Sequence, residues 1–96
     1  MRYNFEWDFN KATTNINKHG VSFEQATRIF LDPLQMVILD SEHSEAEEHG
    51  VTLGKTNDGT MLVVIHPFKE HEDSATIRVI SARKATMREQ RQYEEC

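Results

Sequence analysis

In the first twenty positions of this chain, the spacing of hydrophobic residues changes from the alternation of a strand to the period of a helix. Phe5-Glu6-Trp7 alternates as a short opening strand does. The stretch 10–19 has helical spacing, with Asp8 placed to cap its start and Gly20 placed to end it. The pattern therefore predicts a strand followed by a helix.

A second helix is predicted directly afterwards. Ser22 and Gln25 have the spacing of a capping box, and Asp32-Pro33 ends the helix because proline disfavours a helical residue before it. The apolar residues of this segment fall on one helical face: Phe23, Ala26 and Phe30.

The middle of the chain has the short period of strands. Asn57-Asp58-Gly59 is a turn signal, and the stretch 61–66 is apolar on both faces, as in a central strand. The segment from Phe68 to Ser74 is charged, and we expect a loop without core residues there. The remaining predicted elements are strands at 36–39, 51–53 and 76–82 and a helix at 87–95. Thr86 and Glu89 have the spacing of a capping box at the start of this last helix.

Strands joined by short connections indicate an antiparallel sheet, so the predicted class is α+β. We expect one domain over residues 1–96, with an antiparallel sheet of about four strands packed against N-terminal helices and a C-terminal helix.

Composition narrows the functional classes. The chain has no long apolar run and no apolar leader, and its single cysteine is Cys96, so we expect a cytoplasmic protein without a membrane partner or an internal disulfide. Nucleotide-cradling glycine loops, G-x-S-x-G and Cys-x-x-Cys are absent from the sequence. We therefore expect no cofactor and no metal.

Charge is distributed unevenly. The formal net charge is -5, yet the stretch 78–91 has five basic residues and one acidic residue. A basic segment in an acidic protein indicates a phosphate partner rather than general affinity for polyanions. The basic residues are Arg78, Arg83, Lys84, Arg88 and Arg91.

Three groups of residues occur in order along nearly the whole chain. The first runs from Phe5-Glu6-Trp7-Asp8 through Lys11 and Asn15 to Lys18-His19-Gly20-Val21-Ser22-Phe23. The second comprises Phe30-x-Asp32-Pro33, Asp40-x-x-His43-Ser44-Glu45, Glu47-Glu48 and Gly54. The third comprises Ile80-Ser81-Ala82-Arg83-Lys84-Ala85-Thr86-x-x-Glu89 and Tyr93. Together they resemble the BrnT family, the toxin half of a bacterial type II toxin–antitoxin pair.

The resemblance implies a small RelE-like microbial ribonuclease fold and an endoribonuclease that cleaves cellular RNA and so inhibits translation and growth. It also implies a ribbon-helix-helix antitoxin (BrnA-like) as partner, with operator DNA bound only through that antitoxin. Two positions depart from the family's pattern. His49 stands where the family tends to have arginine, and Phe9 stands where proline is common.

Metal-independent RNA cleavage needs a base for the 2′-hydroxyl, a cation for the charged phosphorane and an acid for the leaving oxygen. Arginine suits the phosphate role because its planar fork stays charged. Arg83 is the first candidate and Arg78 the second, but their odd spacing puts them on opposite faces of an unbroken strand. A bulge or a turn is needed to bring both to one site.

The proton-transfer group remains open among His49, Glu48, Glu47 and His19. Predicted RNA contacts are Lys18, His19, Lys55 and Lys84.

Two other functional classes stay open. The first is a catalytically degenerate toxin that serves as antitoxin-binding partner and corepressor. The second is a small metal-dependent hydrolase built on His43 and His49, although no His-Glu-x-x-His spacing is present.

Overall fold

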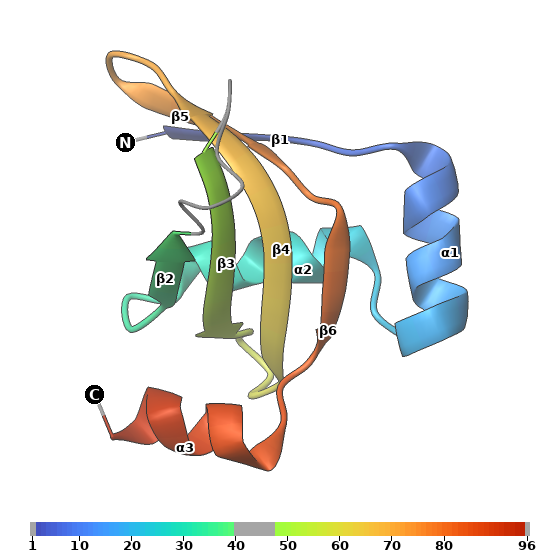
Figure 1. Cartoon of the computed structure of the whole chain (residues 1–96), viewed down its shortest axis with the longest axis vertical. Helices are drawn as coiled ribbons and strands as arrows, with labels where there is room; N and C mark the ends of the chain where they lie inside the picture. The colour runs from blue at the N-terminus through green and yellow to red at the C-terminus, as the bar shows by residue number, and fades with distance from the viewer. Residues whose placement is uncertain (1, 40–47, 96) are drawn as a thin grey trace.

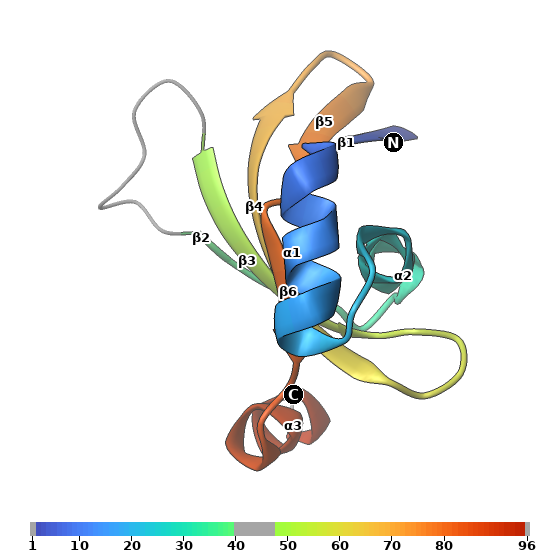
Figure 2. The same cartoon turned by 90° about the vertical axis from the view of Figure 1, so that its right-hand side faces the viewer.

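A six-stranded sheet forms the centre of the molecule in the computed structural model, which describes residues 2–39 and 48–95, with the backbone alone at positions 38, 39, 48 and 49. Helices α1 and α2 lie on one side of the sheet and α3 lies near its lower end (Figures 1 and 2). The strands are β1 (Arg2–Glu6), β2 (Met36–Leu39), β3 (Glu48–Lys55), β4 (Met61–Glu70), β5 (Ser74–Arg78) and β6 (Ser81–Lys84). The helices are α1 (Phe9–His19), α2 (Phe23–Thr27), the 3-10 turn η1 (Arg28–Leu31) and α3 (Met87–Glu94).

The sheet is mixed, so the predicted antiparallel sheet of about four strands was wrong in strand number and in direction. The strand order is β1-β5-β4-β3-β2, and β6 pairs with β4 as well. β1 runs parallel to β5, whereas the other pairs are antiparallel. Short connections predicted the antiparallel pairs correctly, but β1 enters the sheet through a partner about seventy residues later, which local patterns do not reveal. The α+β class is confirmed.

The single strand predicted at 76–82 is divided in two. Phe68 pairs with Ile77 in β5, while Ile65 pairs with Ser81 in β6. Two residues of β4 therefore lie between these pairs, and three residues, 78–80, lie opposite them. One extra residue in one strand of a pair defines a β-bulge. Because of it, odd-numbered side chains of β5 and even-numbered side chains of β6 lie on the same face of the sheet.

The loop predicted from Phe68 to Ser74 was wrong, because β4 continues to Glu70 and Phe68 packs against the core. The carbonyls of Met61 and Ile65 accept hydrogen bonds from the N–H groups of Ala85 and Ile80, which flank β6. The backbone N–H and C=O groups at odd positions of β4 therefore point toward β6. Pro67 therefore faces the extra residue, where its missing N–H costs no regular ladder bond.

Two apolar clusters lie on opposite faces of the sheet. Even positions of β4, Leu62 and Val64, join the helices in the larger cluster, and odd positions, Met61 and Val63, join Tyr93 of α3 in the smaller one. The larger cluster contains Ala12, Val21, Phe23, Ala26, Ile29, Phe30, Leu62, Val64, Ile77, Val79 and Ala82.

The predicted ends of the first and last helices are confirmed, but the second predicted helix is α-helical only over Phe23–Thr27 and continues as the 3-10 turn Arg28–Leu31. Its predicted N-cap, Ser22, accepts from the Gln25 N–H, which is one of the two hydrogen bonds of a capping box. Asp8 accepts from the backbone N–H of Asn10 and Lys11, and Gly20 ends α1 with φ of 71°. Thr86 and Glu89 form both hydrogen bonds of a capping box at the start of α3. These signals depend only on neighbouring residues, so they can be identified from the sequence.

Asn15 joins α1 to the sheet. Its side chain is 5% exposed, donates to the carbonyls of Val21 (2.9 Å) and Ala82 (2.8 Å), and accepts from the Ala82 N–H (3.1 Å). These bonds satisfy backbone groups of β6 and of the loop after α1 that are otherwise buried without partners.

We expect Asn15→Ala to lower the free energy of unfolding by about 3 kcal/mol, because it leaves buried backbone groups unpaired. Urea unfolding measures this change. Asn17→Ala is the matched control, since Asn17 is exposed on the same helix, and we expect it to stay within about 0.5 kcal/mol of the wild type. Equal effects of the two substitutions would contradict the assignment.

Candidate active site

The extra residue between β5 and β6 brings Arg78 and Arg83 to the same face of the sheet. Arg83 pairs with Val63, and Arg78 follows Ile77, the partner of Phe68, so that Arg78 lies beside Pro67. Val63 and Pro67 are both odd positions of β4, on the face opposite the N-terminal helices. We call this surface the arginine face. The structure thus provides the bulge that the odd spacing of the arginines requires.

The β4 residues beside the two arginines, Val63 and Pro67, are four positions apart, so the backbones of the arginines are roughly 13 Å from each other. Ile65 and its partner Ser81 lie between them on the arginine face. Ile65 is 39% exposed. The backbone positions of the two arginines therefore flank a partly apolar row on the same face of the sheet.

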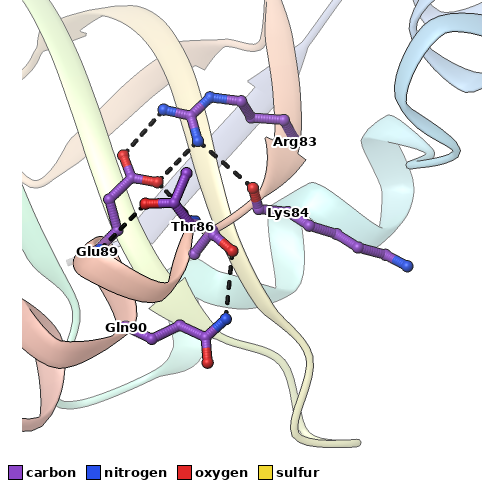
Figure 3. Close-up of polar contacts among 6 residues, drawn as sticks. Arg83, Lys84, Thr86, Glu89 and Gln90 are labelled. Atoms are coloured by element: carbon purple, nitrogen blue, oxygen red, sulfur yellow. Dashed lines mark hydrogen bonds and ion pairs between the residues drawn. The ribbon is translucent and has the colours of Figure 1, made fainter.

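Arg83 is held by Glu89 (Figure 3). Its Nη1 donates to Oε1 at 2.8 Å, its Nη2 donates to Oε2 at 2.9 Å, and Nη1 also donates to the Lys84 carbonyl at 3.4 Å. The bond from Arg83 lowers the pKa of Glu89 to about 2, and the same bond raises the pKa of Arg83. Both groups stay ionised at neutral pH, and the guanidinium is fixed beside the start of α3.

Sequence reasoning missed this role of Glu89. The capping box was recognised, but its carboxylate was assigned only to the helix start. The available signal was position: a capping-box carboxylate stands at the N-terminus of a helix, here just after the strand that bears Arg83.

Arg78 contacts the opening strand. Its Nε donates to Oε1 of Glu6 at 3.2 Å, and both side chains are 52% exposed. An ion pair so exposed contributes little to stability.

Of the two proton-transfer candidates on β3, position 49 lies in a row of the arginine face, whereas position 48 pairs with Phe68, in a row of the opposite face. Glu48 and His49 begin β3, opposite Phe68 and Pro67. Position 49 thus lies in the same cross-strand row as Pro67 and Arg78, about 10 Å from Arg78 by two strand spacings. Glu47 lies outside the described residues.

The predicted RNA contacts do not gather at the arginines. Lys18 and His19 form the last turn of α1, where positive charge complements the helix dipole, and α1 packs on the side of the sheet away from the arginine face. Lys55 and Lys84 line one shallow pocket of about 350 Å³ beside α3. The structure therefore brings these four residues together in two pairs, not in one site.

Lys55 also belongs to a larger pocket of about 420 Å³. The backbone N–H of Lys55 donates to the Asp32 carboxylate at 2.8 Å, and the Tyr93 hydroxyl donates to the same carboxylate at 2.6 Å. The Nζ of Lys55 lies 5.5 Å from the centre of the Tyr93 ring. The bond to Asp32 raises the pKa of Tyr93 to about 12. These contacts fasten the end of α3 to the segment before β2.

A model of the ribonuclease toxin BrnT of type II toxin–antitoxin systems matches residues 7–89. The chain belongs to this family. The match spans both arginines, Glu89 and every predicted RNA contact. Comparison with curated proteins gives no match.

Membership in the BrnT family implies a ribonuclease toxin with an antitoxin partner. Among the described residues, no three His, Cys, Asp or Glu side chains gather as a metal site needs. His43 lies outside those residues, so the alternative metal site of His43 and His49 stays untested. No helix in the described part of the chain is long and apolar enough to cross a membrane.

His66 lies on the opposite face of the sheet from the arginines. It is 2% exposed, its Nε2 is 2.7 Å from the Thr52 hydroxyl, and it lines a pocket of about 370 Å³ with Phe30 and Phe68. Within the described residues its Nδ1 has no hydrogen-bond partner. Burial lowers the pKa of His66 to about 4, from an ordinary value of 6.5.

We expect stability to depend on pH through this BrnT histidine. Between pH 6.5 and about 4 the unfolded chain binds the proton that folded His66 excludes, so the free energy of unfolding falls as the pH falls through this window. The expected slope is about 1 kcal/mol for each pH unit. Urea unfolding at a series of pH values measures it.

His66→Phe removes this titration, so we expect a shallower slope for that variant. His71 is exposed, and His71→Gln is the matched control that retains the wild-type slope. A His66→Phe slope equal to that of the wild type would contradict the prediction.

Proposed function

We propose that this BrnT-family protein is a metal-independent endoribonuclease that cleaves cellular RNA on the arginine face and thereby inhibits translation and growth. The observation that carries the proposal is the alignment of Arg78 and Arg83 by the extra residue between β5 and β6. Two arginines on one open face, separated by small and apolar residues, suit an RNA backbone with a base lying between them.

The proposed reaction uses the 2′-hydroxyl of the substrate as nucleophile. Its oxygen attacks the adjacent phosphorus, its proton passes to a base, and the bond from phosphorus to the 5′-oxygen breaks as that oxygen takes a proton. The products are a 2′,3′-cyclic phosphate and a 5′-hydroxyl. Arg83 stabilises the charge that develops on the phosphorane, and Arg78 binds the same or a neighbouring phosphate.

We assign proton transfer to His49, with Glu48 and Glu47 as alternatives. Position 49 shares a row of the sheet with Arg78, and histidine can both take and give a proton near neutral pH. Lys55 and Lys84 contact RNA beside α3, away from the arginines, and Lys18 and His19 contact RNA that passes α1. No cofactor is needed for this chemistry.

The proposal extends to the fold relationship and to the partner. The fold relationship we propose is to the small RelE-like microbial ribonucleases. The partner we propose is a BrnA-like ribbon-helix-helix antitoxin that alone contacts operator DNA, and the expected location is the cytoplasm.

Cleavage of a defined single-stranded RNA in the presence of chelator tests the function. We expect Arg83→Ala to lower kcat by about a hundredfold or more, because it removes the main phosphorane contact. Arg78→Ala should lower kcat/KM by roughly tenfold. Analysis of the product ends should show the cyclic phosphate and the 5′-hydroxyl.

Arg88→Ala is the matched control, since it removes the same charge from the exposed surface of α3. We expect it to cleave at nearly the wild-type rate. Equal rates for wild type and Arg83→Ala would overturn the site. Failure of the folded wild type to cleave, together with tight antitoxin binding, would instead support the non-enzymatic partner and corepressor.

A further inference from the structure

We propose that Glu89 is a positioning residue for Arg83: it holds one edge of the guanidinium so that the other edge is presented to the RNA phosphate. The inference rests on the proposed ribonuclease function and adds how its main phosphate-binding group is oriented. Glu89 itself does not touch the substrate.

The donors of Arg83 divide into two edges. A guanidinium has five N–H groups. Glu89 accepts one N–H of Nη1 and one N–H of Nη2, and the Lys84 carbonyl accepts the second N–H of Nη1. The Nε–H and the second Nη2–H remain, and neither has a partner among the residues that the structure describes. These two donors are parallel neighbours on one edge, the geometry that binds a phosphate with two hydrogen bonds.

Glu89 is itself held in place. Its Oε1 accepts from the Thr86 N–H at 2.9 Å, and its own N–H donates to the Thr86 hydroxyl at 3.2 Å (Figure 3). At the far end of α3, the Tyr93 hydroxyl is bonded to Asp32. The carboxylate that binds Arg83 therefore belongs to a helix whose two ends are both held by hydrogen bonds.

Fixing Arg83 matters because its side chain is 38% exposed. A free arginine of that exposure samples many rotamers, and ordering it on substrate binding costs free energy. A donor already aimed at the developing charge needs no such ordering during the reaction. Glu89 thus favours catalysis through geometry, although its negative charge lies near the phosphate.

Two matched variants separate positioning from helix capping. Glu89→Gln keeps an oxygen for the Thr86 N–H but replaces the other oxygen with an amide group, which cannot accept from Nη2. Thr86→Ala removes the hydroxyl cap yet leaves both oxygens of Glu89 for Arg83. Their kcat, KM and melting temperature are measured beside wild type, Arg83→Ala and the double variant Arg83→Ala/Glu89→Gln.

We expect Glu89→Gln to lower kcat by tenfold or more, with KM changed less than about threefold, because the bound phosphate contact is misaligned. Thr86→Ala should lower the melting temperature at least as much but keep kcat within about twofold. The double variant should cleave no more slowly than Arg83→Ala, since Glu89 acts only through Arg83. If Glu89→Gln does not fold, Glu89→Asp, which keeps the charge on a shorter stem, should show the same fall in kcat.

Three outcomes overturn the positioning role alone, provided that Arg83→Ala lowers cleavage as expected. These are an unchanged or faster Glu89→Gln enzyme, an equal kcat loss in Thr86→Ala, and additive losses in the double variant. If the folded wild type does not cleave, or Arg83→Ala cleaves normally, the proposed function itself fails and the positioning role is overturned with it.

Discussion

The extra residue opposite His66 and Pro67 determines which side chains share each face of the sheet. Ile77 and Ala82 are both buried against the helices, and they are five residues apart, as Arg78 and Arg83 are. An unbroken strand cannot bury both, because side chains five apart point to opposite faces. The core therefore requires the bulge, and the alignment of the arginines on the other face follows from the same displacement.

The helix ends and the central apolar strand could be predicted because each depends on residues that are neighbours in the sequence. Asp8, Gly20, Thr86 and Glu89 act on neighbouring residues, so their roles were predictable. Parallel pairing of β1 with β5 depends on contacts between distant segments and was not predictable in this way. The bulge was an intermediate case: the odd spacing of the arginines indicated that a bulge or a turn is needed if both are to share one site, while only the packing of the core fixed its place.

Polar residues with more than one partner were the hardest to interpret. Asn15 has the sequence signature of a solvated helix position, yet it bonds backbone groups on two other segments. Glu89 was assigned to one neighbour and has two. In both residues the second set of contacts comes from the approach of α1 or α3 to β6. Tertiary structure thus assigns roles that residue type and spacing leave open.

The parallel pair at the sheet edge has a consequence for the order of assembly during translation. Residues Arg2–Glu6 leave the ribosome first, but their partner strand Ser74–Arg78 is made only after most of the chain. Both arginines and Glu89 belong to the last fifth of the sequence. A nascent chain that stops before position 74 thus has neither the partner of its first strand nor either arginine, so truncated products of a stalled ribosome lack both basic residues of the arginine face.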